Sequence, residues 1–375
     1  MKRSNLLLAL AAVALTAQAQ QWHEGDIQWI NSQEFASNVL KWTTNHQLTE
    51  DDNFFVSRVR PKVRFRNTAT QVREDLKWGE NDRRLVAWMP VNTHSGDGDT
   101  RDALPTGTFD QEVFTMWSYV DHWGDWTAPL GQVPAGLADV AHKNGVGVSG
   151  LASIPFGTIS TEWTNALRAI TQQCTNKESA DAFAAKAAKM MAYYGCDGVG
   201  YNSEFSGFGA TQLGYLRNFH EYLLKNLKAE YQKSVPDYDM QENIWYDGTS
   251  DAGAISFDRG LGLYNYQNWG PLGQERSSLF FNYNWTNRGI LSGSVSNAAH
   301  ADYGQGRSPL YLYCGLNMQG GEPGATTDPW NTFKQYNLSI GLWGQHKVNM
   351  FFEGRGSRGT SPETMQATNQ HRIEN

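Results

Sequence analysis

The sequence predicts an α/β protein built as a (β/α)8 barrel of the TIM type, with its active site at the C-terminal ends of the parallel strands. Short apolar or aromatic segments, each bounded by turn residues, recur along the chain as buried strands do. Helical patterns fill several gaps between these segments, and helices between consecutive strands imply right-handed crossovers and a parallel sheet. A doubly wound open sheet remains the alternative, but no G-x-G-x-x-G motif follows the first strand.

Eight segments are expected to form the strands of the barrel. From the first to the last they span about 270 residues of the chain, which matches the usual size of this fold. They are residues 84–91, 117–126, 145–154, 196–205, 242–248, 278–285, 309–317 and 347–354.

Three segments carry helical patterns, at residues 133–145, 177–195 and 210–233. In the second of them, Ser179 is the expected N-terminal cap, and Gly195 follows the last apolar residue as the expected stop.

Residues 1–19 resemble a signal peptide. Lys2 and Arg3 precede the apolar run "LLLALAAVAL", and "AQA" before Gln20 is a small-x-small cleavage pattern. The run is too short to span a bilayer as a helix, and no cysteine near the cleavage point indicates a lipid anchor. We therefore expect an exported protein, periplasmic or extracellular, without a membrane span.

The rest of the chain divides into three parts. Residues 20–83 are a mixed, charged N-terminal lead-in, and residues 84–354 are the catalytic barrel. Residues 355–375 form a polar tail, which we interpret as a tail or a shortened connection to further modules.

The charge and the cysteine content of the chain limit which partners and ligands are expected. The chain has 31 Lys and Arg against 38 Asp and Glu, a formal charge of −7, which gives no electrostatic reason to bind nucleic acid or anionic lipid. The three cysteines, Cys174, Cys196 and Cys314, lack metal-like spacing and allow one disulfide at most. "HSGDGDT" lacks the full calcium-loop pattern. We expect neither a metal nor another cofactor, and the sequence does not indicate an oligomeric state.

The segment "DGVGYNSEF", residues 197–205, ends the fourth expected strand in an amide and a single acid. Side chains alternate along a strand, so Gly198, Gly200, Asn202 and Glu204 should share one face. If that face is the barrel interior, the glycines leave a hollow beneath the pair. Spacing alone leaves the other interpretation open, in which Glu204 is a surface charge and Asn202 a turn former.

A lone acid beside an amide suits the cleavage of a sugar that carries a 2-acetamido group. The acetamide oxygen can attack the anomeric carbon and replace a protein nucleophile. Glu204 would then act as the acid and base, and Asn202 would hydrogen-bond to the acetamide N–H as charge develops. This chemistry requires a raised pKa at Glu204, which burial among aromatic rings would provide.

Residues 84–353 resemble glycoside hydrolase family 85, the endo-β-N-acetylglucosaminidases that cut the core of N-linked glycans. "DGVGYNSE" is similar to the family's Asn-x-Glu strand, "NIWYDG" to the next strand and "FFNYNW" to the sixth, in the family's order. The resemblance implies Glu204 as acid and base, Asn202 as the acetamide-orienting residue and Tyr246 as its assistant. It places Trp285 on a substrate-facing wall and implies N-linked glycans as substrate.

The chain departs from the family at several positions. Phe257 stands where relatives tend to carry tryptophan, so a smaller aromatic platform is expected there. "AWMPVNTH" and "HWGDWT" also differ from the family's segments at strand ends that contact glycan, which leaves glycan preference open.

Several alternatives remain open from the sequence. Trp123 and Trp126 are candidates for sugar stacking or for packing at the rim. Without the resemblance, Tyr246 would be a core tyrosine, and Trp285 would fit the core as well as a site. Two other functions compete with the endoglycosidase: a family 18-like chitinase or endoglycosidase, and a glycan-binding barrel with reduced catalysis.

Overall fold

The computed structural model describes residues 32–42, 56–62, 83–88, 117–126, 128–257, 260–269, 277–283, 285, 288–304, 306–317 and 335–343. The expected signal peptide, the polar tail and the expected strand at 347–354 lie outside these residues.

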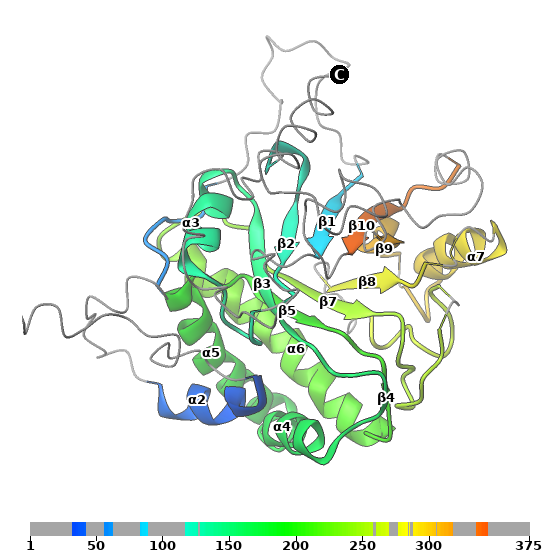
Figure 1. Ribbon diagram of the computed structural model, residues 1–375, viewed down its shortest axis with the longest axis horizontal. Helices are drawn as coiled ribbons and strands as arrows, with labels where there is room; N and C mark the ends of the chain where they lie inside the picture. The colour runs from blue at the N-terminus through cyan, green and yellow to red at the C-terminus, as the bar shows by residue number, and fades with distance from the viewer. Residues whose placement is uncertain are drawn as a thin grey trace, which may run out of the picture.

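Eight parallel strands form a closed barrel, which confirms the predicted fold (Figure 1). The strands follow one another around the barrel in chain order, and the last closes the ring because it pairs with both its predecessor and the first. They are β1 (Leu85–Trp88), β2 (His122–Gly124), β3 (Gly147–Ala152), β5 (Gly198–Tyr201), β7 (Glu242–Tyr246), β8 (Ser277–Phe281), β9 (Leu312–Asn317) and β10 (Ser339–Trp343).

The eighth strand was predicted at the wrong place. The barrel is closed by β10, "SIGLW", whereas the prediction put this strand at 347–354. β10 is five residues long and has Gly341 at its centre, and a short run interrupted by glycine gives a weak strand signal.

The three predicted helices are present as α3 (Ala135–Lys143), α5 (Lys177–Tyr194) and α6 (Ala210–Gln232). The cap of α5 differs from the prediction. Asn176 is the N-cap and its side chain accepts from Ser179 N at 2.9 Å, while Ser179 Oγ accepts from Asn176 N at 3.3 Å. Ser179 is therefore the second half of a capping box. Gly195 ends the helix at φ 90°, as predicted.

Further elements were not predicted from the sequence. A small parallel pair is formed by β4 (Gly157–Thr158) and β6 (Phe205–Ser206), which follow the strands β3 and β5 in the chain. The remaining helices are α2 (Phe35–Lys41), α4 (Thr161–Thr171), α7 (Arg288–Ala299) and the 3-10 turns Ser32–Glu34, Trp117–Tyr119 and Pro309–Tyr311.

Parts of the N-terminal lead-in pack against the barrel helices. Phe35 of α2 is fully buried, and its ring meets Phe219 of α6 edge-on at a centroid distance of 5.9 Å. Residues 56–62 lie against α3, where the Asp139 carboxylate accepts from Ser57 Oγ at 2.7 Å and Val59 N at 3.1 Å. Helix α2 therefore contributes to the same core as the barrel, and hydrogen bonds hold residues 56–62 to α3.

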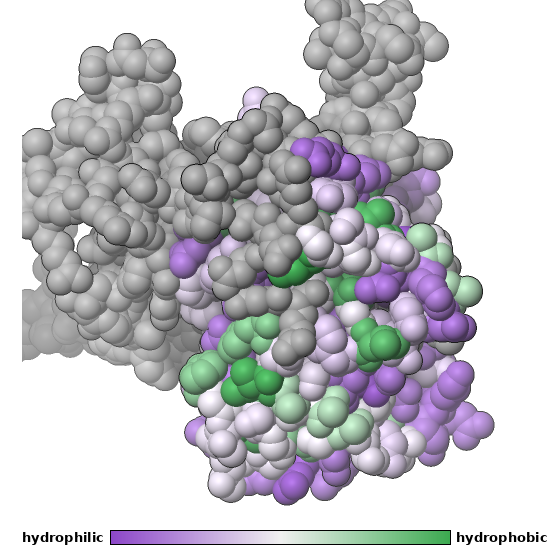
Figure 2. All heavy atoms as spheres, turned by 90° about the vertical axis from the view of Figure 1, so that its right-hand side faces the viewer, coloured by the Kyte–Doolittle hydropathy of each residue, from purple (hydrophilic) through white to green (hydrophobic). Residues whose placement is uncertain are grey.

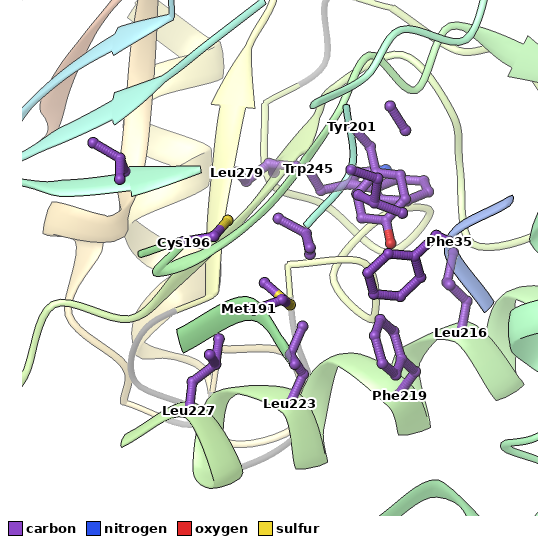
Figure 3. Close-up of a cluster of buried hydrophobic side chains, with 14 of the residues drawn as sticks. Phe35, Met191, Cys196, Tyr201, Leu216, Phe219, Leu223, Leu227, Trp245 and Leu279 are labelled. Carbon is purple, nitrogen blue, oxygen red and sulfur yellow. The ribbon is translucent and has the colours of Figure 1, made fainter. Parts of the chain in front are cut away.

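The outer core lies between the strands and the helices α5 and α6. Side chains spaced three or four residues apart on α6 point towards the outward-facing Tyr201 and Trp245 of the barrel (Figure 3). The three cysteines are free and buried, and Cys196 lies in this layer.

The surface on the side that carries β4 and α7 shows small hydrophobic patches separated by hydrophilic residues (Figure 2). Among the described helices, none is long and apolar enough to cross a membrane.

Two large rings fill the barrel interior. Trp88 and Phe280 are fully buried with ring centroids 5.1 Å apart. Inward-facing glycines make room for them: a Cβ atom at any of four positions would approach one of these rings within 3.2 Å. The glycines are Gly124 and Gly200 beside Trp88, and Gly315 and Gly341 beside Phe280.

A buried ion pair closes the N-terminal end of the barrel. Arg84 Nη2 lies 2.5 Å from Glu242 Oε2, and the Tyr313 hydroxyl donates to Glu242 Oε1 at 2.7 Å. Burial opposes charge on Glu242, but Arg84 and the surrounding donors hold the pKa of this carboxyl below its usual value. This polar floor lies opposite the mouth where the strands end.

Candidate active site

Asn202 and Glu204 follow directly after β5, at the C-terminal mouth of the barrel. Two hydrogen bonds hold their segment to both neighbouring strands: Asn202 N donates to Ala152 O at 3.0 Å, and Ser203 Oγ donates to Tyr246 O at 2.7 Å. The pair is therefore fixed between the ends of β3 and β7.

Thr249 reinforces the same segment from the loop after β7. Its hydroxyl donates to Ser203 O at 2.7 Å and accepts from Phe205 N at 3.0 Å. Both sides of Glu204 are thus bonded to a single buried side chain, which limits how far the carboxylate can move.

The two side chains contact each other. Asn202 Nδ2 donates to Glu204 Oε2 at 3.3 Å and to Ile154 O at 3.1 Å. Strand alternation would have separated them by about 6 to 7 Å, but β5 ends at Tyr201 and the following residues bring the side chains together. Because both bonds use Nδ2, the amide is oriented with Oδ1 as its acceptor for a ligand.

The pKa of Glu204 is shifted in the direction that a general acid needs. Burial raises the pKa of this carboxyl, and the hydrogen bond from Asn202 lowers it in part. The side chain is only half-buried, so it remains accessible from the mouth. A partly desolvated carboxyl stays protonated to a higher pH than a solvated one, so it still has a proton to donate there.

The hollow predicted beneath the pair does not exist. A Cβ atom on Gly200 would lie 3.1 Å from Trp88 Cζ2, so the indole from β1 occupies that space. The glycine strand alone does not reveal this, because Trp88 comes from β1. The missed signal was an aromatic residue two positions after the buried Val86, on the same inward face of β1.

Tyr246 ends β7 inside the mouth. Its ring lies 6.4 Å from Trp88, 6.0 Å from Phe280 and 6.2 Å from Phe257. The hydroxyl of Tyr283, which sequence analysis missed, hydrogen-bonds to Tyr246, and burial raises the pKa of Tyr283, with a further contribution from Tyr246. Tyr283 comes from the segment after β8, so the structure brings two tyrosines from neighbouring strands together.

Trp126 and Phe257 lie at the mouth as expected. Trp126 packs edge-on against Trp88 at 6.1 Å and against Trp343, the last residue of β10, at 5.2 Å. Phe257 lies over Tyr246 on another side of the opening. Trp343 was missed because its strand was predicted at the wrong place.

Trp123 and Trp285 do not face the mouth, which corrects their assignment as substrate-binding residues. Trp123 is 3% exposed and packs on Trp117 at 5.4 Å, because its neighbour Gly124 occupies the inward position. Trp285 is 2% exposed, and its Nε1 donates to Gly315 O at 2.7 Å. Both rings belong to the outer core.

Among the side chains that the structure describes, no group of three or more His, Cys, Asp or Glu is arranged to hold a metal ion.

Known proteins resemble this chain in both sequence and fold. The sequence model of glycosyl hydrolase family 85 matches residues 95–360. A protein of Danio rerio named cytosolic endo-beta-N-acetylglucosaminidase is 25% identical over 236 residues, which cover 62% of this chain and 30% of that protein. The crystal structure of the Endo-D glycoside hydrolase domain from Streptococcus pneumoniae superposes with a TM-score of 0.64 at 24% identity, covering 92% of this chain and 49% of that one.

These matches differ in what they establish. The chain spans less than half the length of either protein, and the likeness to Endo-D shows the fold. The family match is the broader sequence evidence, because it covers well over half of the chain and includes the described residues from β2 to β10. A closed (β/α)8 barrel with Asn202 and Glu204 at its mouth, in a sequence that matches the family over this range, therefore belongs to glycosyl hydrolase family 85.

Proposed function

We propose that this chain is an endo-β-N-acetylglucosaminidase that hydrolyses the GlcNAc-β-1,4-GlcNAc core of N-linked glycans with retention of configuration. The observation that carries the proposal is the contact between Asn202 Nδ2 and Glu204 Oε2 at the end of β5. Family membership supports a glycoside hydrolase, and the name of the Danio rerio relative supports this bond specificity.

In the first step the substrate supplies its own nucleophile. The acetamide carbonyl oxygen attacks the anomeric carbon and forms an oxazolinium ion, the N-protonated oxazoline, while Glu204 gives its proton to the departing glycosidic oxygen. Asn202 Oδ1 accepts from the acetamide N–H, whose acidity rises as the ring forms, so this bond strengthens in the transition state.

In the second step Glu204 acts as a base. Its carboxylate takes a proton from water, the water oxygen bonds to the anomeric carbon, and the bond from that carbon to the oxazolinium oxygen breaks, which restores the neutral acetamide with its N–H. Two inversions at one carbon give net retention. Tyr246 assists at the acetamide from the neighbouring strand, and Tyr283 positions it through their hydrogen bond.

Release of glycan from a high-mannose glycoprotein tests the proposal. Mass analysis should find one GlcNAc left on the asparagine, and Glu204→Gln should abolish release, because the amide cannot donate the proton. The matched control is Glu162→Gln, which changes an exposed glutamate in the first turn of α4. Unchanged release by Glu204→Gln would refute the assignment.

The role of Asn202 predicts a donor-dependent effect. Asn202→Ala should lose most of its glycan hydrolysis, and it should use a preformed oxazoline donor less well than Asn202→Gln does, because only glutamine retains an amide. Equal donor use by the two variants would argue against an orienting role.

The pH profile offers a second test of the same pair. Activity on glycan should decline as pH rises through the raised pKa of Glu204, since only the protonated carboxyl can act as the acid. Loss of the Asn202 hydrogen bond removes an influence that lowers this pKa. The residual activity of Asn202→Ala should therefore decline at a higher pH than that of the unaltered chain, and an unshifted profile would contradict the coupling.

We also propose that the protein is exported. The support is the basic, apolar and small-residue pattern of residues 1–19. The relative named as cytosolic is only 25% identical. Mass analysis of the mature N-terminus tests this proposal: it should begin at Gln20, and a chain that retains residues 1–19 in the cell would refute it.

A further inference from the structure

A cavity of about 390 Å³ lies at the end of the barrel opposite the mouth. Its walls are the C-terminal turns of α5 and α6, Arg60 of the segment that packs on α3, and Trp42, which follows α2. Tyr231 in this wall donates to Cys196 O at 3.2 Å, and Cys196 comes two residues before β5 begins. Glu204 follows the other end of β5, so the cavity is separate from the candidate active site. Its volume falls in the range of small-molecule binding sites.

The cavity carries an excess of positive charge. Among the described residues that line it, Arg60, Lys189 and Lys233 are basic and Glu230 is acidic. Lys233 Nζ forms an ion pair with Glu230 Oε2, whereas neither Arg60 nor Lys189 has an ion-pair partner among the described residues. Two positive charges thus remain on the wall of a chain whose formal charge is −7. The cavity therefore attracts an anion to a protein that otherwise repels anions.

Aromatic side chains line the same cavity. Trp42 and Tyr193 are half-buried and meet edge-on with ring centroids 5.7 Å apart. Tyr231 is buried, and burial raises the pKa of its hydroxyl, while the nearby charge of Arg60 acts in the opposite direction. The guanidinium therefore lies close to the aromatic wall. A bare inorganic anion would leave these rings unused, whereas an aromatic face can cover the C–H face of a pyranose.

We propose that this cavity binds an acidic sugar, a pyranose whose ring lies against Trp42 and Tyr193 and whose carboxylate lies between Arg60 and Lys189. A guanidinium offers two parallel N–H donors that match a carboxylate, and an ammonium adds a point charge. The inference does not rest on the proposed function, because the cavity is separate from Glu204. Such a site retains a glycoprotein that carries acidic sugars while the mouth stays free.

Titration calorimetry with three small probes tests the site. N-acetylneuraminate has both the sugar ring and the carboxylate, its methyl ester keeps the ring without the charge, and acetate has the charge without the ring. N-acetylneuraminate should bind at millimolar concentration with one site per chain. The methyl ester should bind at least about tenfold more weakly, because the charge-assisted hydrogen bonds are lost. Acetate should also bind more weakly, because it makes no contact with the rings.

Variants of exposed side chains locate the site. Arg60→Gln and Lys189→Gln should each weaken the binding of N-acetylneuraminate by about tenfold, the scale of one charge-assisted hydrogen bond. The matched control is Lys186→Gln, which changes an exposed lysine of α5 one turn before Lys189 and outside the cavity wall. This control should bind as the unaltered chain does. Glu204→Gln should also keep the unaltered affinity, because Glu204 lies at the other end of the barrel.

Four results would overturn the proposal. Equal binding of the acid and its methyl ester would show that charge does not hold the ligand, and equal binding of acetate would reduce the cavity to a site for simple anions. If Arg60→Gln and Lys189→Gln bind as Lys186→Gln does, the ligand lies elsewhere. Absence of binding by N-acetylneuraminate would refute the site altogether. Calorimetry needs no turnover, so these results stay distinguishable from a failure of glycan release.

Discussion

Gly124 leaves no room for a side chain in the barrel interior. A Cβ atom at this position would lie 2.1 Å from Trp88 Cδ1 and 2.4 Å from Trp88 Nε1. Ordinary contact begins near 3.4 Å, so Gly124→Ala requires the indole to retreat by about 1.3 Å. Retreat is blocked on the far side, where Trp88 lies 3.1 Å from the Cβ position of Gly200 and stacks obliquely on Phe280 at 5.1 Å.

Gly124→Ala should lower the free energy of unfolding, because the indole of Trp88 cannot move aside. Overpacking a close-packed interior costs about 1–3 kcal/mol, and the upper part of that range is expected because the ring is fully buried. Trp88 also supports Tyr246 at 6.4 Å, so activity on glycan should fall with stability.

Urea unfolding at constant pH measures the effect, with Gly293→Ala as the matched control. Gly293 lies within α7 and has no atom within 4 Å of its Cβ position. Alanine at this helical position should raise the free energy of unfolding by about 0.5–1 kcal/mol. In a Trp88→Leu background the Gly124→Ala penalty should shrink by at least about 1 kcal/mol, because the obstructing ring is gone. Equal effects of the two alanine substitutions in the unaltered background would refute the packing argument.

Three further predictions concern parts of the fold that support the site. Burial alone would lower the pKa of His142, but Asp197, whose carboxylate lies 2.8 Å from Nε2, raises this pKa above the ordinary 6.5. The free energy of unfolding should therefore be greatest below about pH 6.5 and should decline as pH rises through the folded-state pKa. Urea titrations across pH should find this dependence removed in Asp197→Asn. Glu242→Gln leaves the buried guanidinium of Arg84 without its counter-charge and should cost about 3–5 kcal/mol of unfolding free energy, and a cost near zero would contradict the pairing. Gly195 has φ 90°, and a Cβ atom there would lie 2.4 Å from Ser57 Cβ, so Gly195→Ala should cost more free energy of unfolding than the about 1–2 kcal/mol of the left-handed conformation alone; a cost below that range in thermal unfolding would contradict the contact.

Much of the barrel could be predicted because its signals are local. Six of the eight barrel strands fall within predicted segments and β8 begins one residue before its segment, because buried strands between turn residues can be recognised without knowledge of their neighbours. β10 failed because it is short and has a glycine at its centre. The cap of α5 was displaced by three residues, because Asn176 and Ser179 both fit a capping pattern and only their reciprocal bonds distinguish their roles.

The candidate site was predictable in part for a related reason. Asn202, Glu204 and Tyr246 sit at strand ends, so chain position and fold class placed them at one mouth. Trp123 and Trp285 also sit near strand ends, yet both rings pack outward. Small differences in where a strand begins and ends decide which face a side chain takes, because alternation reverses with each residue.

By itself the sequence determined the barrel class and the residue types of the candidate site, since these depend on local periodicity and on the chemistry of single side chains. Only the tertiary structure decided that Trp88 fills the space beside Gly200, that Tyr283 meets Tyr246, and that Phe156 stacks on Phe257 beside Glu204. Each of these contacts joins different strands or their loops. The registers of those strands and the paths of their loops are set by packing around the whole barrel, a sum of many contacts that no single segment encodes.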